Sequence, residues 1–237
     1  MLGNERHRYQ AIRFSCTSRC DSFRDKRSRT KHRRKYGLLG TGFHGTNGID
    51  PITAYQIYKT YVLPRLLYSL EILPLTRTQI NLLEGFHRKS ISMQSLPQRT
   101  AVSAVYLLIG AYPVEAEIHL RQLSLLYSLL SCHDGKIKEV VSRQISVNYD
   151  NTKSFFCNIR KMLEIYELPK IHELQSNLPP KPKWKNLVNS TIKKYWTEKL
   201  KEETSGKTTL KFMSCDHLAI GDSHPVWKLP PRPQLLV

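Results

Sequence analysis

The stretch from Asp50 to Pro97 most constrains the fold, because its local signals agree on helices that prolines interrupt. An aspartate can cap a helix and a proline suits the first helical turn, so Asp50 and Pro51 predict a helix start. Behind that start, apolar residues recur at steps of three or four, which gives a helix one apolar face. The predicted face consists of Tyr55, Tyr58, Val62, Leu66 and Leu70.

Further prolines divide this stretch into two limbs. Pro64 removes one backbone hydrogen bond and crowds the preceding turn, so we expect a kink, or two helices that meet near Leu63. Pro74 ends the first limb, and Thr76 with Gln79 predicts a capping box at the start of the second. The two limbs together predict a helical hairpin with basic residues on its outer side.

The remaining chain also has helical periodicity, which favours an all-α fold. The pattern predicts a bundle of about six to eight helices, with a disordered basic N-terminal arm and a loose C-terminal tail. One possible strand covers 210–213. The helices expected after the hairpin run from Thr100 to Gly110, from Pro113 to Gly135, over 137–147, from Ser154 to Pro169, and onward from Pro182.

Composition shifts along the chain suggest five segments. Residues 1–35 form the disordered basic arm, and residues 36–49 form a glycine-rich hinge. The helical bundle is expected over 50–180, followed by an amphipathic helix over 181–205 and an irregular tail over 206–237. We interpret the Trp184 stripe of the amphipathic helix as core packing rather than as a platform on which bases stack.

The chain is strongly basic, with 37 Lys and Arg against 19 Asp and Glu, a formal net charge of +18. Residues 1–35 alone hold 12 of the basic groups and three of the acids. Such a balance favours a polyanionic partner, because each phosphate that Lys or Arg neutralises releases condensed counterions.

The runs YVLPRLLYSLEIL, LLEGFHRKSI and LPQRTAVSAVYLLIGAYPVEAEIHLRQL lie within the block from Tyr61 to Leu123. This block resembles the region that follows the polymerase palm in reverse transcriptases of non-LTR retrotransposons. Upstream, KYGLLGTGFHGTNGIDP looks like the linker from palm to thumb, and downstream SFFCNIRKMLEIYELP, the Trp184 helix and HPVW are similar to the tail of the same family. The resemblance extends from Arg24 to Leu229 and is most specific in the central block.

The resemblance implies a thumb and connection region without its palm. Members of the family are RNA-directed DNA polymerases, and their palm holds Mg²⁺ through paired aspartates. None of the seven aspartates of this chain is adjacent to another. We therefore expect a non-catalytic piece that needs no cofactor of its own, with Mg²⁺ required only by the missing palm.

In such a piece the expected partner is an RNA/DNA duplex, gripped through phosphates and shape, because A-form helices hide their base edges from side chains. Charge and family position favour two groups of cations, one before the hinge and one on the hairpin. The predicted nucleic-acid-binding residues are Lys31, Arg33, Arg34, Lys35, Lys59, Arg65, Arg88 and Lys89.

Motifs for other chemistry are incomplete. Cys16 and Cys20 lack the second histidine of a zinc finger, and the Cys215 region lacks the spacing of a zinc knuckle, so no metal site is expected. The glycines at 40, 42 and 45 match a dinucleotide-binding pattern, but no buried strand precedes them. Lone histidines such as His87 and His119 are interpreted as structural or merely exposed.

The sequence predicts neither a membrane span nor secretion. The longest uncharged run, Thr100 to Val114, has 15 residues and contains Gly110 and Pro113, whereas a span needs about 20 apolar residues. The N-terminal residues do not resemble a secretory signal, and five irregularly spaced cysteines suit a reducing compartment. We expect a location in the nucleus or cytoplasm.

Three other functions remain open at this stage. A helical scaffold that binds protein would expose an apolar patch without a basic face beside it. An enzyme in its own right would need converging acids or histidines in a pocket. A decayed gene fragment would have no present activity.

Overall fold

The computed structural model describes residues 51–92, 101–148, 154–207 and 218–228. All of them belong to the second of two compact units, Asp50–Val237, and their regular secondary structure is entirely helical, which confirms the all-α prediction. The predicted basic arm, the glycine-rich hinge and the 210–213 strand lie outside the described residues. None of the helices in these ranges has the length and apolar character needed to cross a bilayer.

The first limb begins with α4 (Pro51–Ile57) and ends with α5 (Leu63–Leu66), and one π-helical segment, Tyr58–Val62, joins them. In that segment the backbone N–H of Leu63 donates to the carbonyl of Tyr58, a step of five residues. Pro64 follows directly and has no N–H for the next α-helical bond, which accounts for the wider turn at this point. The predicted interruption near Leu63 is therefore confirmed, and its form is a π-helical turn.

This wider turn shifts the buried face of the first limb by one residue. Tyr58, Leu63 and Leu67 are buried, at steps of five and four, whereas the predicted positions Val62 and Leu66 are only partly buried. The prediction was wrong at these two positions because it assumed regular α-helical geometry through the proline. Tyr55, Tyr58 and Leu70 are buried as predicted.

The second limb is α6 (Arg77–Ser92), and its predicted capping box is confirmed. The backbone N–H of Thr76 donates to Oε1 of Gln79 at 2.9 Å, and the backbone N–H of Gln79 donates to Oγ1 of Thr76 at 3.4 Å. Each side chain thus satisfies a backbone amide that the helix start leaves without a partner.

Next come α7 (Val102–Ile109) and α8 (Val114–Leu130), separated by a tight turn. Gly110 ends α7 in the left-handed conformation at φ 74°, as expected for a glycine at a helix C-terminus. The predicted end of α8 at Gly135 was wrong, because α8 stops at Leu130. Gly135 instead opens α9 (Gly135–Val147), where the carboxylate of Asp134 accepts from the N–H of Lys136 at 2.9 Å.

The C-terminal half contains α10 (Phe155–Ile165), α11 (Ile171–Ser176) and α12 (Lys181–Ser205). The periodicity did not predict α11, a short helix between two proline-containing turns. Its start is supported by Glu173, whose carboxylate accepts from the backbone N–H of Lys170 at 3.2 Å. In the predicted α12 stripe, Trp184, Val188, Ile192 and Trp196 are buried and Tyr195 is partly buried, which confirms its interpretation as core packing.

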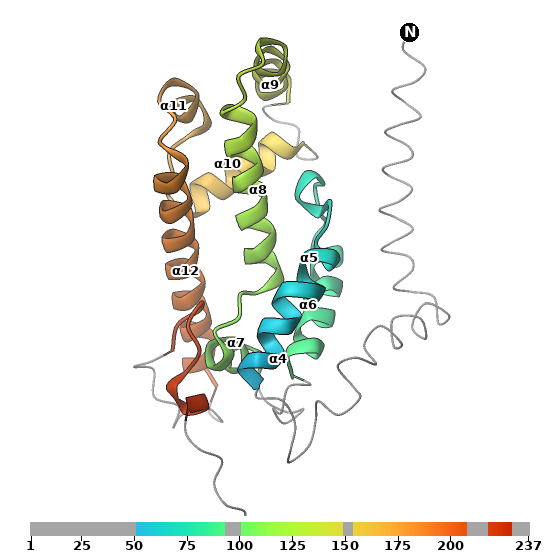
Figure 1. The fold of residues 1–237 in the computed structure, drawn as a ribbon, viewed down its shortest axis with the longest axis vertical. Helices are drawn as coiled ribbons and strands as arrows, with labels where there is room; N and C mark the ends of the chain where they lie inside the picture. The colour runs from blue at the N-terminus through green and yellow to red at the C-terminus, as the bar shows by residue number, and fades with distance from the viewer. Residues whose placement is uncertain (1–50, 93–100, 149–153, 208–217, 229–237) are drawn as a thin grey trace, which may run out of the picture. The chain divides into compact units, whose positions relative to one another are not determined.

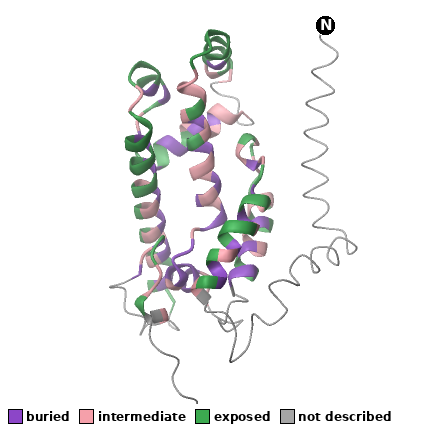
Figure 2. Ribbon diagram, viewed as in Figure 1, coloured by how far each residue is buried: buried purple, intermediate pink, exposed green. Residues whose placement is uncertain are grey.

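Helix α8 is the central element of this unit. It contacts α6, α9, α10 and α12, and Figure 1 shows it between α12 and the α4–α6 hairpin. In Figure 2 the buried residues follow its length and continue into α7. Tyr166 ties three helices together: its hydroxyl lies 2.7 Å from Nδ1 of His119 on α8 and accepts from Nε1 of Trp196 on α12 at 2.8 Å.

Residues 218–228 pack against the turn between α7 and α8. Leu218 and Ile220 are buried, and the N–H of Gly221 donates to the carbonyl of Gly110 at 2.8 Å. The indole N–H of Trp227 donates to the carbonyl of Leu108 at 2.8 Å. This segment therefore contributes to the core although its only regular structure is a single 3-10 turn, Pro225–Lys228.

Candidate nucleic-acid interface

The structure places the hairpin half of the predicted interface on exposed helical positions. Lys59 lies in the π-helical segment, Arg65 in α5, and Arg88 and Lys89 in α6, and all four are exposed. The other predicted residues, at 31 and 33–35, lie outside the described residues.

A buried hydrogen-bond chain joins the two limbs beneath these cations. The hydroxyl of Tyr58 lies 2.7 Å from Nδ1 of His87, and Nε2 of His87 lies 2.9 Å from the carbonyl oxygen of Tyr112. A carbonyl only accepts, so Nε2 donates and Nδ1 accepts from Tyr58. Burial lowers the pKa of His87 to about 4, which keeps its imidazole neutral. His87 is fully buried, which confirms its structural interpretation.

Lys59 lies near Tyr112, in the turn between α7 and α8, and near Glu117 on α8. Its ammonium nitrogen is 5.9 Å from the ring centroid of Tyr112, a cation–π arrangement. Burial raises the pKa of Glu117, while the charges of Lys59 and Arg121 act to lower it. The positive charge of Lys59 therefore already interacts with Tyr112 and Glu117. Of the four hairpin cations, Lys59 is the least available to an external anion.

Arg88 lies near another half-buried carboxyl group, that of Glu84. Burial raises the pKa of Glu84, and the nearby charge of Arg88 opposes this shift. Glu84 accepts from the hydroxyl of Tyr106 and, at 2.9 Å, from the backbone N–H of Val114 at the start of α8. Because Glu84 is held by these two donors, it serves the packing of α6 against α7 and α8.

The four hairpin cations fall into two pairs. Lys59 and Arg65 belong to the first limb, whereas Arg88 and Lys89 are neighbours on the second. Within the part of the chain that the structure describes, none of the four makes an ion pair, in contrast to Arg77, which pairs with Glu115 at 2.8 Å. Arg65, Arg88 and Lys89 therefore remain available to an external anion.

A second basic feature, which the sequence analysis missed, is a groove between α8 and α12. It has a volume of about 220 Å³ and is lined by Arg121 from α8 and by Lys181 and Lys185 from α12. No acidic side chain lines it. Lys181 and Lys185 lie four residues apart, so they share one face of the helix. The spacing of the two lysines could have been found in the sequence. The position of Arg121 beside them could not, because it depends on how α8 packs against α12.

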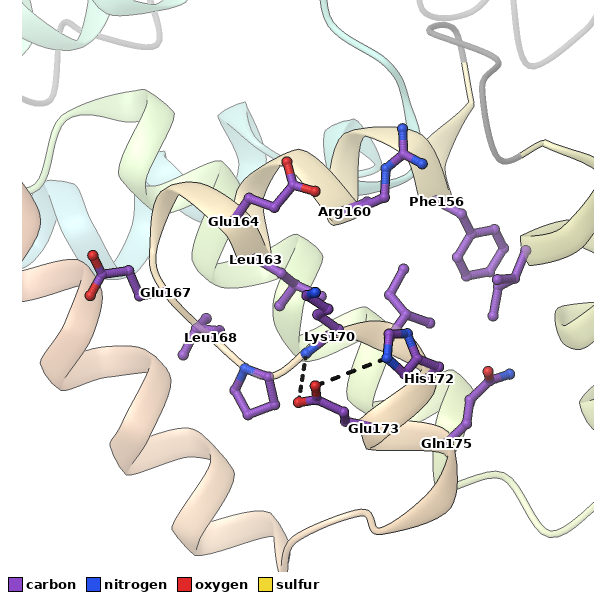
Figure 3. Close-up of a pocket in the computed structure, with 13 residues that line it drawn as sticks. Phe156, Arg160, Leu163, Glu164, Glu167, Leu168, Lys170, His172, Glu173 and Gln175 are labelled. Carbon is purple, nitrogen blue, oxygen red and sulfur yellow. Dashed lines mark hydrogen bonds and ion pairs between the residues drawn. The ribbon is translucent and has the colours of Figure 1, made fainter.

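A cavity of about 720 Å³ lies among α9, α10 and α11. Apolar side chains such as Phe156 and Leu163 line it, and charges of both signs surround it. Figure 3 shows that Glu164 and Glu167 point away from one another, while Glu173 interacts with Lys170 and His172. These carboxylates do not converge on one point of the cavity.

Among the described residues there is no group of three or more His, Cys, Asp or Glu side chains that could hold a metal ion. His119 is held by Tyr166, and burial lowers its pKa to about 4, which confirms its structural interpretation. Comparisons of the chain with protein-family models, with curated proteins and with solved structures give no match. Any functional conclusion therefore depends on the residues themselves.

Proposed function

We propose that this protein binds an RNA/DNA duplex through its phosphates, as a non-catalytic piece related to the thumb and connection region of non-LTR retrotransposon reverse transcriptases. The observation that carries the proposal is the set of exposed cations on the α4–α6 hairpin, in a chain with a net charge of +18. The family resemblance described above supports the same partner.

The chemistry of the hairpin suits phosphate contact. Arg65 and Arg88 carry planar guanidinium groups that can donate two hydrogen bonds to one phosphate, and Lys89 adds a point charge. These contacts position a protein on a duplex without reading its sequence. We therefore expect recognition of charge and shape, with little preference for base sequence.

A catalytic role is not part of the proposal. Two-metal nucleotidyl transfer needs carboxylates placed together around the ions, and the aspartates of this chain stand apart from one another in the sequence. Glu84 of α6, which is half-buried, already accepts hydrogen bonds from Tyr106 and Val114.

The test is filter binding of an RNA/DNA duplex by the full chain, with the charges of the hairpin removed. In the variant R65Q/R88Q/K89Q we expect the affinity to fall at least tenfold and the salt dependence to become shallower by roughly 0.9 in slope for each lost phosphate contact. The matched control is K136Q/K138Q/R143Q, which removes the same charge from exposed positions of α9. Equal losses in both variants would reject a role specific to the hairpin.

A second candidate function is a helical scaffold that binds another protein. It is favoured by α9, which exposes Ile137, Val140 and Val147, the last at 71% of its surface. Only Val141 of this helix is buried. Substitution of Val140 and Val147 by Ser should leave duplex binding unchanged under the first proposal, whereas a scaffold would lose its protein partner.

A further inference from the structure

We propose that the groove between α8 and α12 binds one nucleotide unit of a single-stranded nucleic acid, with the phosphate at Arg121, Lys181 and Lys185 and the base against the apolar floor. This site is separate from the hairpin surface. It concerns unpaired strands rather than duplexes, so it can hold even if the hairpin cations do not bind duplex.

The first argument is charge. Lys181 and Lys185 are exposed, and neither makes an ion pair with any of the described residues, whereas the charge of Arg121 also acts on Glu117 of α8. The first turn of α12 contains no acidic residue, so these cations stand at the positive end of the helix dipole, where positive charge is unfavourable. A bound phosphate would relieve this repulsion, and a cation would increase it.

The second argument is the floor of the groove. Of its apolar side chains, Leu120 and Tyr127 are partly exposed, whereas Trp184 and Val188 are buried core residues. Both aromatic rings are fixed: the hydroxyl of Tyr127 donates to the carbonyl of Pro179 at 3.0 Å, and the indole N–H of Trp184 lies 3.4 Å from the carbonyl of Leu123. The partly exposed ring of Tyr127 is therefore already ordered, and a base that packs on it causes no further loss of side-chain entropy.

The third argument is size. The groove has a volume of about 220 Å³, which is below the roughly 300 Å³ at which pockets for whole small molecules begin. It therefore suits one unit of a longer chain whose neighbours lie outside. Ser124 and Asn189 at its edge offer a hydroxyl and an amide to the polar rim of a base.

These features favour a nucleotide over an acidic peptide. A nucleotide carries a flat apolar body and a phosphate in one unit, which matches an apolar floor below a basic rim. An aspartate or glutamate side chain would meet the cations but leave the floor uncovered. The net charge of +18 also favours a polymer with a charge on every unit.

The experiment measures fluorescence anisotropy of a labelled oligothymidylate of about ten nucleotides, which cannot pair with itself, on the full chain. Ser124→Phe fills the groove without changing any charge, and Asn189→Phe fills it from the other helix. We expect each substitution to weaken binding roughly tenfold, the loss that corresponds to one base contact. K181Q/K185Q should weaken binding by a similar factor, while K183Q/K194Q, two exposed lysines of α12 outside the groove, should have a smaller effect.

Thermal melts by circular dichroism establish that each variant is folded, and the two filling variants ensure that the result does not depend on one of them. Unchanged affinity in the folded filling variants would overturn the proposal, as would equal losses in K181Q/K185Q and K183Q/K194Q. A labelled oligoglutamate that binds as tightly as the oligothymidylate, and is lost in Ser124→Phe, would assign the groove to acidic peptides instead. R88Q/K89Q should keep its affinity for the single strand, which separates this proposal from that of the hairpin.

Discussion

At Gly110, both the backbone conformation and the close packing of a neighbouring segment require a residue without a side chain. Its φ is 74°, and a Cβ built on it would lie 2.3 Å from the carbonyl oxygen of Asp222. We expect Gly110→Ala to lower the free energy of unfolding by roughly 2–4 kcal/mol, because both the conformation and the contact become unfavourable. Urea denaturation measures this difference.

Gly85 provides the matched control for this prediction. It lies inside α6 with nothing within 4 Å of a built Cβ. Gly85→Ala should therefore stabilise the protein by about 0.5–1 kcal/mol, since alanine is the better helix former. A similar loss in both variants would show that the close approach of Gly110 to Asp222 is not a feature of the protein.

His87 makes stability depend on pH. Burial lowers its pKa to about 4 from 6.5, so between these values the unfolded chain binds a proton that the folded protein does not. The contribution of His87 is present above about pH 6.5 and is lost as the pH falls toward 4, by at most about 3 kcal/mol. His119 acts in the same direction, whereas burial raises the pKa values of Glu84 and Glu117, whose contributions are lost as the pH rises.

The comparison of the parent with His87→Gln isolates this one residue. Urea denaturation across pH 7 to about pH 4 should give a steeper loss of stability in the parent than in the variant, although the variant is less stable at neutral pH. Parallel curves for the two proteins would contradict a buried, neutral His87.

At the scale of elements, the π-helical turn decides which residues of the first limb are buried. Leu67 is wholly buried and its neighbour Leu66 is not. The same substitution at these two positions therefore tests which of them faces the core. We expect Leu67→Ala to cost about 2–5 kcal/mol and Leu66→Ala about 1 kcal/mol or less. A regular α-helix through Pro64 would give the opposite order in urea denaturation.

Local signals explain which elements the sequence analysis predicted correctly. The capping box of Thr76 and Gln79 and the stop at Gly110 depend on a few adjacent residues, and both are present. The burial of Leu63 depends on how the helix adjusts to Pro64, and the start of α9 at Gly135 depends on the cap that Asp134 supplies. In both cases the local sequence is compatible with two backbone conformations, and the packing of the helices determines which one forms.

The candidate sites depend even more on tertiary structure. The hairpin cations were identified from charge and resemblance, and the exposure of Arg65, Arg88 and Lys89 is compatible with that interpretation. The groove was missed because Arg121 lies about sixty residues before Lys181 and Lys185 in the sequence. Only the packing of α8 against α12 brings them together, and periodicity within one helix carries no information on such a pairing.

At the scale of the whole unit, α8 contacts α6, α9, α10 and α12, so these helices should unfold together. Far-ultraviolet circular dichroism and tryptophan fluorescence, which reports on the buried Trp184 and Trp196, should give coincident thermal transitions. Separate midpoints, or a gradual loss of ellipticity, would mean that the helices do not form one cooperative core.

We propose that the exposed cations of the α4–α6 hairpin bind a phosphate backbone. The most direct test is filter binding of an RNA/DNA duplex to the full chain over a series of salt concentrations. If the three independent hairpin cations each neutralise one phosphate, the logarithm of the association constant should fall against the logarithm of salt concentration with a slope of about −2.7 or steeper. An affinity that does not change with salt would contradict phosphate binding.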